Sequence, residues 1–470
     1  MTGSQSRAVS RRGLLATAAG AILQREERPN IIFLLTDDQR WDTLGAMGNR
    51  IIQTPNIDLL AAGGVRFTNQ FVTTSICMSS RASIFTGQYE RTHGMTEFSR
   101  QLSAGQFSRT YPALLRKAGY RTGFIGKYGL DGAPLPAHEF DYWRGFAGQG
   151  RYLPPGGKGP HLTRVMGDQA LEFLQGCAPA QPFFLQVSFK APHVQDEDPR
   201  QFIYDPASES MYKDVTIPEP ETADPRYIAM LPIEVQRSEN RRRWAVRFST
   251  PELYQRSVKA YYRLISEVDR EAGRIREQLA RQGQSERTVI IFSSDNGFYL
   301  GEHGLAGKWI PHEESIRVPL IVYDPRAAGR LRGAARSEMT LNIDIAPTIL
   351  SLAGLRAPES MQGRDLTPLL EGRQTPWRSE FFYEHAFTNP GGWVPRTEGI
   401  RDQRWKYFRY LDAEPLFEEM YDLAADPLEK RNLAREPRFA GELERLRRRW
   451  QTWRDHLERY SVSQRWVEPA

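Results

Sequence analysis

Four short apolar stretches, each followed at once by charged or amide side chains, constrain this chain most strongly. They cover residues 30–35, 120–125, 182–189 and 288–292, and each is typical of a strand buried on both faces. The residues that follow them are Asp37 and Asp38, Lys127, Lys190 and His193, and Asp295 and Asn296. In open α/β sheets, chemistry lies just beyond the carboxyl ends of the strands. The pattern predicts an α/β fold with a large, mostly parallel sheet flanked by helices.

Two of these strand ends carry oxygen ligands. The adjacent carboxylates of Asp37 and Asp38 repel each other unless a cation neutralises them. Asp295 and Asn296 add further hard oxygen atoms, the ligands that Ca²⁺ and Mg²⁺ prefer. We therefore predict a divalent cation site, with an aspartate pair that caps the following helix as the alternative.

One of the two cysteines lies where a helix is expected to begin. Cys77 opens the stretch 77–85, and Arg81 falls one turn later on the same face. The N-terminus of a helix offers unpaired backbone N–H groups and a partial positive charge to anions. These two residues fit an anion-binding nucleophile site, although the motif alone favours a buried cysteine beside a helix cap.

Composition narrows the classes of partner. The 470 residues are enough for one large domain and a smaller one, and we place the boundary between 28–374 and 375–470. The net charge of +6 suits anionic substrates, but there is no compact Lys/Arg run, so nucleic acid is not expected. No stretch approaches about 20 apolar residues, so no membrane span is expected.

The N-terminus predicts export. Arg11 and Arg12 precede a short apolar stretch that ends near Leu23, which is typical of a Tat-type signal in residues 1–27. A periplasmic or extracellular location follows, with a disordered basic tail as the alternative. Only two cysteines are present, so the chain is not a disulfide scaffold.

Three further segments differ in composition and periodicity. Residues 195–250 show little periodicity and predict a long surface insertion that forms one wall of a cleft. Residues 251–279 predict one long amphipathic helix packed on the sheet. Residues 140–152 predict either a pocket-lining loop or a packed aromatic loop, and short aromatic strands with a charged helix follow Pro376.

Several motifs in order resemble the type I sulfatases of the alkaline-phosphatase-like superfamily. Residues 54–69 resemble the family pattern TPNxDxLAxxGxxFxN, and residues 77–87 resemble its Cys-x-Pro/Ala-x-Arg motif, with Ser79 at the third position. Asp-Asn-Gly at 295–297 and Gly-Glu-His-Gly at 301–304, followed by Lys308, continue the match. Lys127 fits the family's Gly-Lys-Trp-His, but Gly129 stands where the histidine is expected.

The resemblance implies a site and a mechanism. A formylglycine-generating enzyme would convert Cys77 to formylglycine (3-oxoalanine), whose hydrated aldehyde attacks the sulfur of a sulfate ester. One divalent cation, Ca²⁺ or Mg²⁺, would polarise the sulfate. The implied metal ligands are Asp37, Asp38, Asp295, Asn296 and position 77. The implied catalytic residues are Cys77, Arg81, Lys127, His193 and Lys308, and the sulfate or substrate contacts are Lys127, His193, His303 and Lys308.

The implied activity is removal of sulfate from an exported sulfated glycan or polysaccharide. One alternative is a phosphomonoester or phosphonate hydrolase of the same superfamily, which a second metal ion would favour. Another is a catalytically inactive glycan-binding relative, suggested by Ser79 and Gly129.

Overall fold

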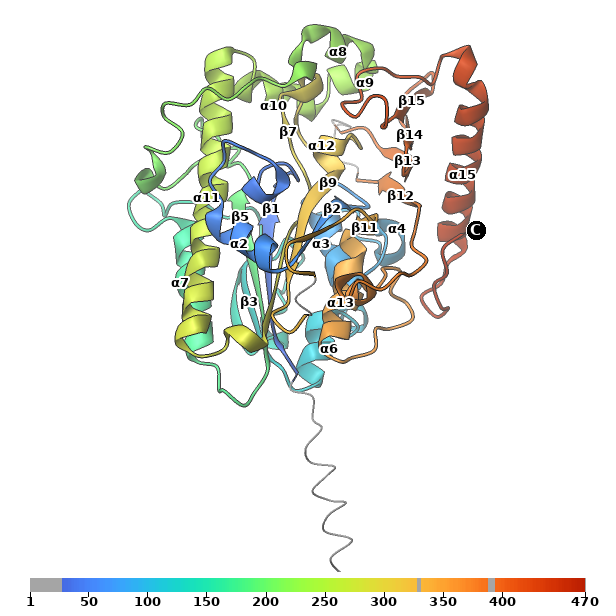
Figure 1. The fold of residues 1–470 in the computed structure, drawn as a ribbon. Coiled ribbons are helices and arrows are strands. Elements are labelled where there is room, and N and C mark those ends of the chain that lie inside the picture. Colours follow the sequence, from blue (N-terminus) through green and yellow to red (C-terminus); the bar gives the residue numbers. More distant parts are fainter. Residues whose placement is uncertain (1–27, 328–330, 388–393, 470) are drawn as a thin grey trace, which may run out of the picture.

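The computed structural model describes residues 28–327, 331–387 and 394–469, and its largest element there is a nine-stranded sheet (Figure 1). Its strands are β1 (Asn30–Asp37), β2 (Val65–Phe71), β3 (Arg121–Lys127), β4 (Tyr142–Phe146), β5 (Phe183–Pro192), β6 (Thr288–Ser294), β9 (Arg317–Tyr323), β10 (Ala334–Arg336) and β11 (Thr340–Leu341). The order is β10-β2-β9-β6-β1-β5-β3-β4, and β11 also pairs with β2.

The centre of this sheet is parallel. β1 lies between β5 and β6 and runs parallel to both, and β3 continues the parallel set beyond β5. Only β9, among the described strands of this sheet, is antiparallel to its neighbours. Every residue of β1, β5 and β6 is buried, as expected for strands covered on both faces. Their carboxyl ends therefore meet at one edge of the sheet.

Helices cover both faces of the sheet (Figure 1). One apolar core joins the sheet to α2 (Pro55–Gly63), α7 (Leu162–Gln175) and α11 (Pro251–Arg281). A second core joins it to α3 (Cys77–Thr86), α6 (Tyr111–Lys117) and α13 (Ile345–Leu352) on the other face. The long helix α11 begins at Thr250, whose hydroxyl caps the backbone N–H of Leu253. The sheet is thus held rigidly between two helical layers.

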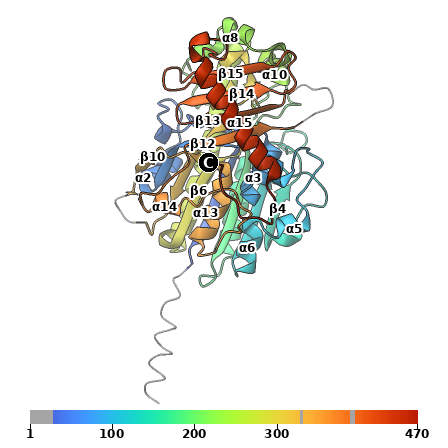
Figure 2. The same ribbon diagram turned by 90° about the vertical axis from the view of Figure 1, so that its right-hand side faces the viewer.

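A second, antiparallel sheet follows near the C-terminus. It contains β12 (Glu380–His385), β13 (Thr397–Asp402), β14 (Trp405–Tyr410) and β15 (Phe417–Asp422), in that order. Helix α15 (Ala440–Arg459) crosses this sheet, as the turned view in Figure 2 shows. Its Trp450 and Trp453 share one core with Phe71 and Val318 of the large sheet. The subdomain is therefore packed onto the large sheet through apolar side chains.

The predicted fold class is confirmed, with corrections in detail. The strands expected at 30–35, 120–125, 182–189 and 288–292 are present, and each extends two or three residues further toward the site. Residues 142–146, expected to lie in a loop, instead form the edge strand β4. The insertion 195–250 contains three short helices, α8 (Pro225–Met230), α9 (Ile233–Gln236) and α10 (Glu239–Arg247).

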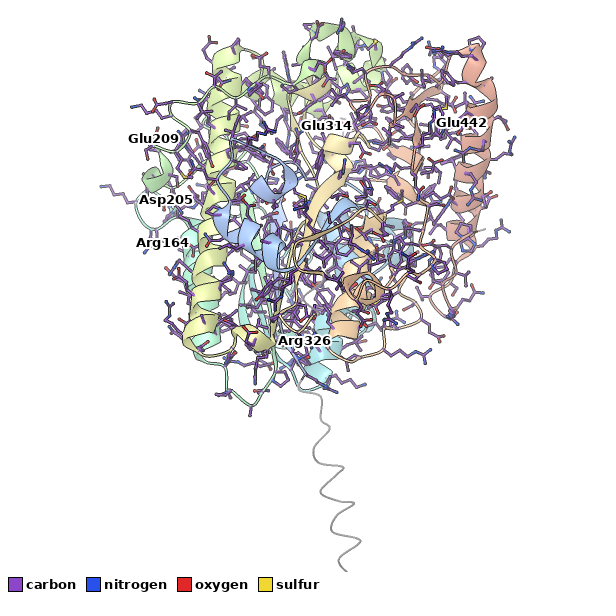
Figure 3. All side chains as sticks on the ribbon, viewed as in Figure 1. Arg164, Asp205, Glu209, Glu314, Arg326 and Glu442 are labelled. Atoms are coloured by element: carbon purple, nitrogen blue, oxygen red, sulfur yellow. The ribbon has the colours of Figure 1, made fainter. Side chains whose placement is uncertain are left out.

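Charged side chains of both signs lie around the outside of the molecule. Arg164, Asp205 and Glu209 lie on the side of α7 and α11, and Glu442 lies on α15 at the opposite side (Figure 3). Among the described residues, no helix is both long and apolar enough to cross a lipid bilayer. The predicted export signal, residues 1–27, falls outside the described residues.

Candidate active site

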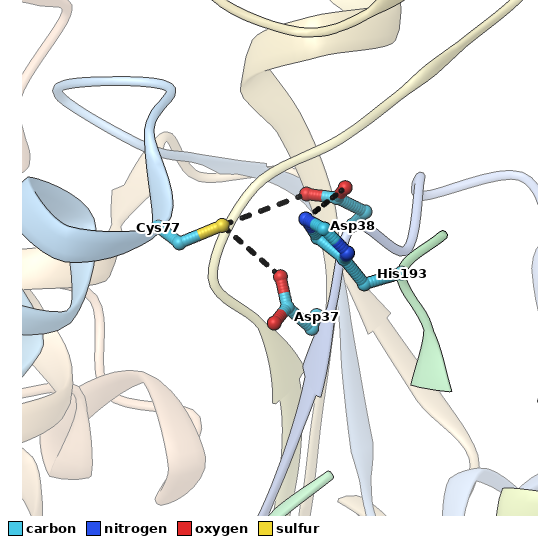
Figure 4. A group of neighbouring side chains, drawn as sticks. All are labelled: Asp37, Asp38, Cys77 and His193. Carbon is cyan, nitrogen blue, oxygen red and sulfur yellow. Dashed lines mark hydrogen bonds and ion pairs between the residues drawn. The ribbon is translucent and has the colours of Figure 1, made fainter. Parts of the chain in front are cut away.

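The carboxyl ends of the central strands and the first turn of α3 meet at one point. Asp37 is the last residue of β1, His193 follows β5, and Cys77 is the first residue of α3. Their ligand atoms, with those of Asp38, all lie within 4.8 Å of one another (Figure 4). Residues from distant parts of the sequence thus form one buried cluster.

Cys77 is held between carboxylates and a lysine. Its Sγ lies 3.1 Å from Oδ1 of Asp37 and 3.9 Å from Oδ1 of Asp38, and it accepts a hydrogen bond of 2.8 Å from Nζ of Lys308. Burial, followed by the negative charge of Asp37, raises the pKa of the thiol above its ordinary value, and Lys127 and Lys308 only partly oppose this. The unmodified side chain is therefore a protonated thiol near neutral pH, which is a poor nucleophile.

Asp37, Asp38 and Asp295 carry unequal pKa shifts. Burial opposes ionisation of Asp37, but the positive charges beside it, Lys127 and Arg81 among them, outweigh burial, so its pKa lies well below the ordinary value. Burial raises the pKa of Asp38, and burial together with Asp37 raises the pKa of Asp295 to about 6. A φ of +68° turns Asp38 so that its backbone N–H reaches Oδ1 of Asp295 at 3.1 Å.

These residues fit a hard divalent cation. The amide nitrogen of Asn296 donates to Asp38, while its Oδ1 is buried and accepts no hydrogen bond from a described residue. That oxygen and the three carboxylates form the donor set that Ca²⁺ or Mg²⁺ prefers. A bound dication would also offset the repulsion among the three buried carboxylates.

Arg81 links the two halves of the carboxylate cluster from behind. Its Nε donates to Oδ2 of Asp295 at 2.8 Å, and its Nη2 lies 3.3 Å from Oδ2 of Asp37. Nη1 donates to the backbone oxygen of Lys127 at 2.6 Å and to Ser188 at 2.5 Å. The guanidinium is 1% exposed and therefore fixes the positions of the aspartates.

Two lysines contact the carboxylates of the cluster. Nζ of Lys127 lies 2.5 Å from Oδ2 of Asp37 and 2.7 Å from Oε1 of Gln149. Nζ of Lys308 donates to Asp38 and to Cys77. Although burial opposes it, the neighbouring carboxylates raise the pKa of both lysines. Two permanent positive charges therefore lie beside the point where an anionic substrate would reach Cys77.

His193 has a fixed tautomer. Its Nδ1 lies 2.6 Å from the backbone oxygen of Val194, which can only accept, so Nδ1 carries the proton. Nε2 therefore carries no proton, and it lies 3.6 Å from Oδ2 of Asp38. Burial, together with Lys127 and Lys308, lowers the pKa of the ring well below its ordinary value. His193 is therefore neutral and presents a nitrogen lone pair to the cluster.

A cavity of about 310 Å³ opens onto this cluster. Cys77, His193, Lys308 and Gln149 lie at its inner end. One wall is apolar and is built from Ile76, Phe98, Trp309, Phe387 and Val394. The facing wall is charged and comes from the insertion 195–250, with Asp196, Glu239, Arg242 and Arg243. The prediction that this insertion forms one wall of a cleft is confirmed.

Comparison with known proteins places this site in a family. The sulfatase family model matches residues 29–355, and a model of the C-terminal part of N-sulphoglucosamine sulphohydrolase matches residues 301–456. An N-acetylglucosamine-6-O-sulfatase of Bacteroides thetaiotaomicron is 30% identical, with 91% of this chain and 86% of that protein covered. The chain belongs to the sulfatase family.

Two further relatives of this sulfatase are informative. A solved structure of a protein in complex with its substrate D-glucosamine-2-N,6-O-disulfate has a TM-score of 0.79 and 28% identity, covering 94% of this chain and all of that one. An extracellular sulfatase homolog of Drosophila melanogaster is 28% identical over 77% of this chain and 33% of its own length. Relatives of this sulfatase thus include an extracellular protein.

The structure shows what surrounds two departures from the family pattern. Ser79 is buried and does not line the cavity, and its Oγ has no hydrogen-bond partner among the described residues. At Gly129, φ is +81° and an added Cβ would lie 2.4 Å from Cδ of Arg81. No side chain fits at position 129 while Arg81 keeps its contacts, so the family's histidine has no room there.

One predicted substrate contact lies elsewhere. His303 is buried in a turn, where its ring stacks on His312 with the centroids 4.6 Å apart. It is not among the residues that line the cavity. The other predicted residues do come together, namely Asp37, Asp38, Cys77, Arg81, Lys127, His193, Asp295, Asn296 and Lys308.

The sequence did not predict the apolar wall of the cavity, for which Trp309, adjacent to Lys308, was the available signal. Gln149 lies in the stretch 140–152, and its place in the cavity lining agrees with the prediction of a pocket-lining loop. Phe98, Phe387 and Val394 come from segments without periodicity and carry no such signal. Lys190 was expected to follow a strand but lies within β5, and its Nζ donates to the backbone oxygen of Val194 and does not line the cavity.

Proposed function

We propose that this sulfatase removes a sulfate ester from a glucosamine-type sugar of an exported glycan. The observation that carries the proposal is the position of Cys77, whose Sγ lies at the inner end of the cavity between two carboxylates and Lys308. Relatives that act on N-acetylglucosamine 6-sulfate and bind a disulfated glucosamine support the choice of sugar.

Position 77 supplies the nucleophile only after modification. Because burial raises the pKa of the thiol, unmodified Cys77 is a protonated thiol in this pocket. Conversion to formylglycine by a formylglycine-generating enzyme would replace the sulfur with a hydrated aldehyde, whose second hydroxyl permits release of the sulfate. The neighbouring Lys308 and Asp37 are within hydrogen-bonding reach of a group at this position.

Asp37, Asp38, Asp295 and Asn296 would hold a divalent cation, most simply Ca²⁺. The cation would polarise the sulfate and favour ionisation of the nucleophile at position 77. The unpartnered Oδ1 of Asn296 and the three carboxylates support this choice of ligands. Arg81 keeps Asp37 and Asp295 in place through two of its nitrogens.

The side chains around the sulfate have separate roles. Lys127 and Lys308 carry permanent charge and offset the charge that develops on the sulfate oxygens. His193 is neutral and holds its bare Nε2 toward the cluster, so it accepts a hydrogen bond or a proton there. The apolar wall at Trp309 and Ile76 provides a surface for one face of a sugar ring.

The size of the cavity favours one sulfated sugar unit. About 310 Å³ is at the lower end of the volumes of ligand cavities in proteins.

We propose that the Tat-type signal of residues 1–27 exports this sulfatase, so that the enzyme meets its substrate in the periplasm or beyond it. The extracellular relative supports such a location.

Mass spectrometry of the tryptic peptide 67–81, from protein coexpressed with its maturation enzyme, tests the proposal. We expect an aldehyde at position 77, release of sulfate from N-acetylglucosamine 6-sulfate, and loss of that release on metal chelation. Cys77→Ala should abolish turnover. Cys177→Ala is the matched control and should keep it, because Cys177 lies at the end of α7, away from the cavity.

Two other results would each favour a different function. An alkylatable thiol at position 77 in every preparation, with sugar binding intact, would favour the inactive glycan-binding relative. Release of phosphate or phosphonate in place of sulfate would favour the hydrolase of phosphorus esters.

A further inference from the structure

The turn that follows β3 offers no side chain to the leaving group. Lys127 ends the strand, and Gly129 adopts a φ of +81° against the side chain of Arg81. Arg81 is held in this position by Asp295 and by the backbone oxygen of Lys127, at 2.8 and 2.6 Å. Side chains that contact the departing oxygen therefore have to come from the other segments that line the cavity.

Gln149 reaches the cavity from the loop that follows β4. Its Oε1 accepts a hydrogen bond of 2.7 Å from Nζ of Lys127. A lysine can only donate, so this bond fixes which end of the amide faces it. The amide nitrogen then points away from Lys127. Gln149 lines the cavity with Cys77, His193 and Lys308, and its Nε2 has no hydrogen bond to another described residue.

We infer that Gln149 contacts substrate and donates a hydrogen bond from Nε2 to the ester oxygen that leaves. The inference rests on the proposed function. As sulfur is transferred to the oxygen at position 77, the S–O bond to the sugar breaks and its electron pair stays on the sugar oxygen. Gln149 stabilises that charge and keeps both of its protons, and solvent water supplies the proton that completes the alcohol.

Two variants separate this role from a structural one. Gln149→Glu keeps an oxygen for Lys127 but has no N–H to donate, whereas Gln149→Met removes both. If Gln149 only positioned Lys127, Gln149→Glu would remain active. We expect both variants to lower kcat for the sugar sulfate by about 100-fold, the typical effect of removing one such donor. KM should change little.

Comparison of leaving groups gives the second readout. An aryl sulfate such as 4-nitrophenyl sulfate departs with little charge on oxygen, so we expect its kcat to fall less than about tenfold in the same variants. Repulsion between the sulfate and the carboxylate that Gln149→Glu introduces would affect both substrates equally. Equal losses for both substrates, or wild-type activity in Gln149→Glu, would overturn the assignment.

A crystal structure of Cys77→Ala with bound sugar sulfate checks the contact without turnover. Nε2 of Gln149 should lie within about 3.2 Å of the ester oxygen. A sugar sulfate seated in the cavity with Gln149 turned away would refute the role of Gln149 and leave the proposed function standing. Failure of the wild-type protein on both substrates would instead refute the proposed function.

Discussion

At the scale of single residues, the site depends on one buried arginine that does not line the cavity. Arg81 is 1% exposed and joins Asp37, Asp295, Ser188 and the backbone of Lys127. A lysine could not make these contacts together, because they need the planar fork of a guanidinium. The spacing of four residues places Cys77 and Arg81 on one face of α3.

Removal of Arg81 should cost both stability and activity. Arg81→Ala leaves buried carboxylates without their partner, so we expect the free energy of unfolding to fall by about 3–5 kcal/mol in urea titrations. The control is Arg116→Ala, which removes a partly exposed pair with Asp141 and should cost less than about 1 kcal/mol. Equal losses in the two variants would contradict this account of the site.

At the scale of elements, two glycines at opposite ends of β3 differ in what surrounds them. Gly119 precedes the strand with a φ of +91° and has nothing within 4 Å of an added Cβ. Gly129 follows the strand with a φ of +81°, and there an added Cβ would meet Arg81 at 2.4 Å. Both need the left-handed region, but only Gly129 is also confined by the site.

Alanine at these two positions separates strain from crowding. Gly119→Ala and Gly129→Ala should each lose about 1–2 kcal/mol of stability from the left-handed backbone. Only Gly129→Ala should also displace Arg81 and lower kcat by at least about tenfold, measured as release of sulfate. Normal turnover in Gly129→Ala would show that Arg81 can shift without harm to the site.

The elements also show what the sequence could predict. Buried parallel strands have continuous apolar runs, and their carboxyl ends share one edge, so Asp37, Lys127 and Asp295 could be placed together without a structure. Phe387 could not, because it lies in a loop whose course depends on tertiary packing, whereas Gln149 lies in the stretch 140–152, for which a pocket-lining loop was one of two predictions. His303 follows a family motif, but its turn directs the ring onto His312.

At the scale of the whole molecule, the C-terminal sheet and the site region share buried ionisable groups. Glu90 begins α4 (Glu90–His93), just after the helix that carries Cys77, and it is fully buried. Its Oε2 accepts hydrogen bonds of 3.2 Å from Thr74 and from the backbone N–H of Ala386, which follows β12. Burial and then Glu384 raise its pKa to about 8. Glu90 is therefore protonated, and uncharged, at neutral pH.

A raised carboxyl pKa in the folded state predicts how stability depends on pH. Because the folded protein holds this proton more tightly than the unfolded chain, the stabilisation is complete below pH 4.5 and is lost as the pH rises to about 8. Glu90→Gln mimics the protonated form, so relative to this variant the wild-type protein should lose up to about 1.4 kcal/mol per pH unit across that window.

Urea titrations at several pH values measure this difference, with Glu97→Gln as the exposed control that should follow the wild type. Because Trp450 and Phe71 share one core, we also expect both parts of the molecule to unfold in a single transition. Parallel curves for the wild type and Glu90→Gln would mean that folding leaves the pKa of Glu90 unchanged, so that Glu90 is ionised in the folded protein at neutral pH. The backbone N–H of Ala386 would then donate its hydrogen bond to a charged carboxylate.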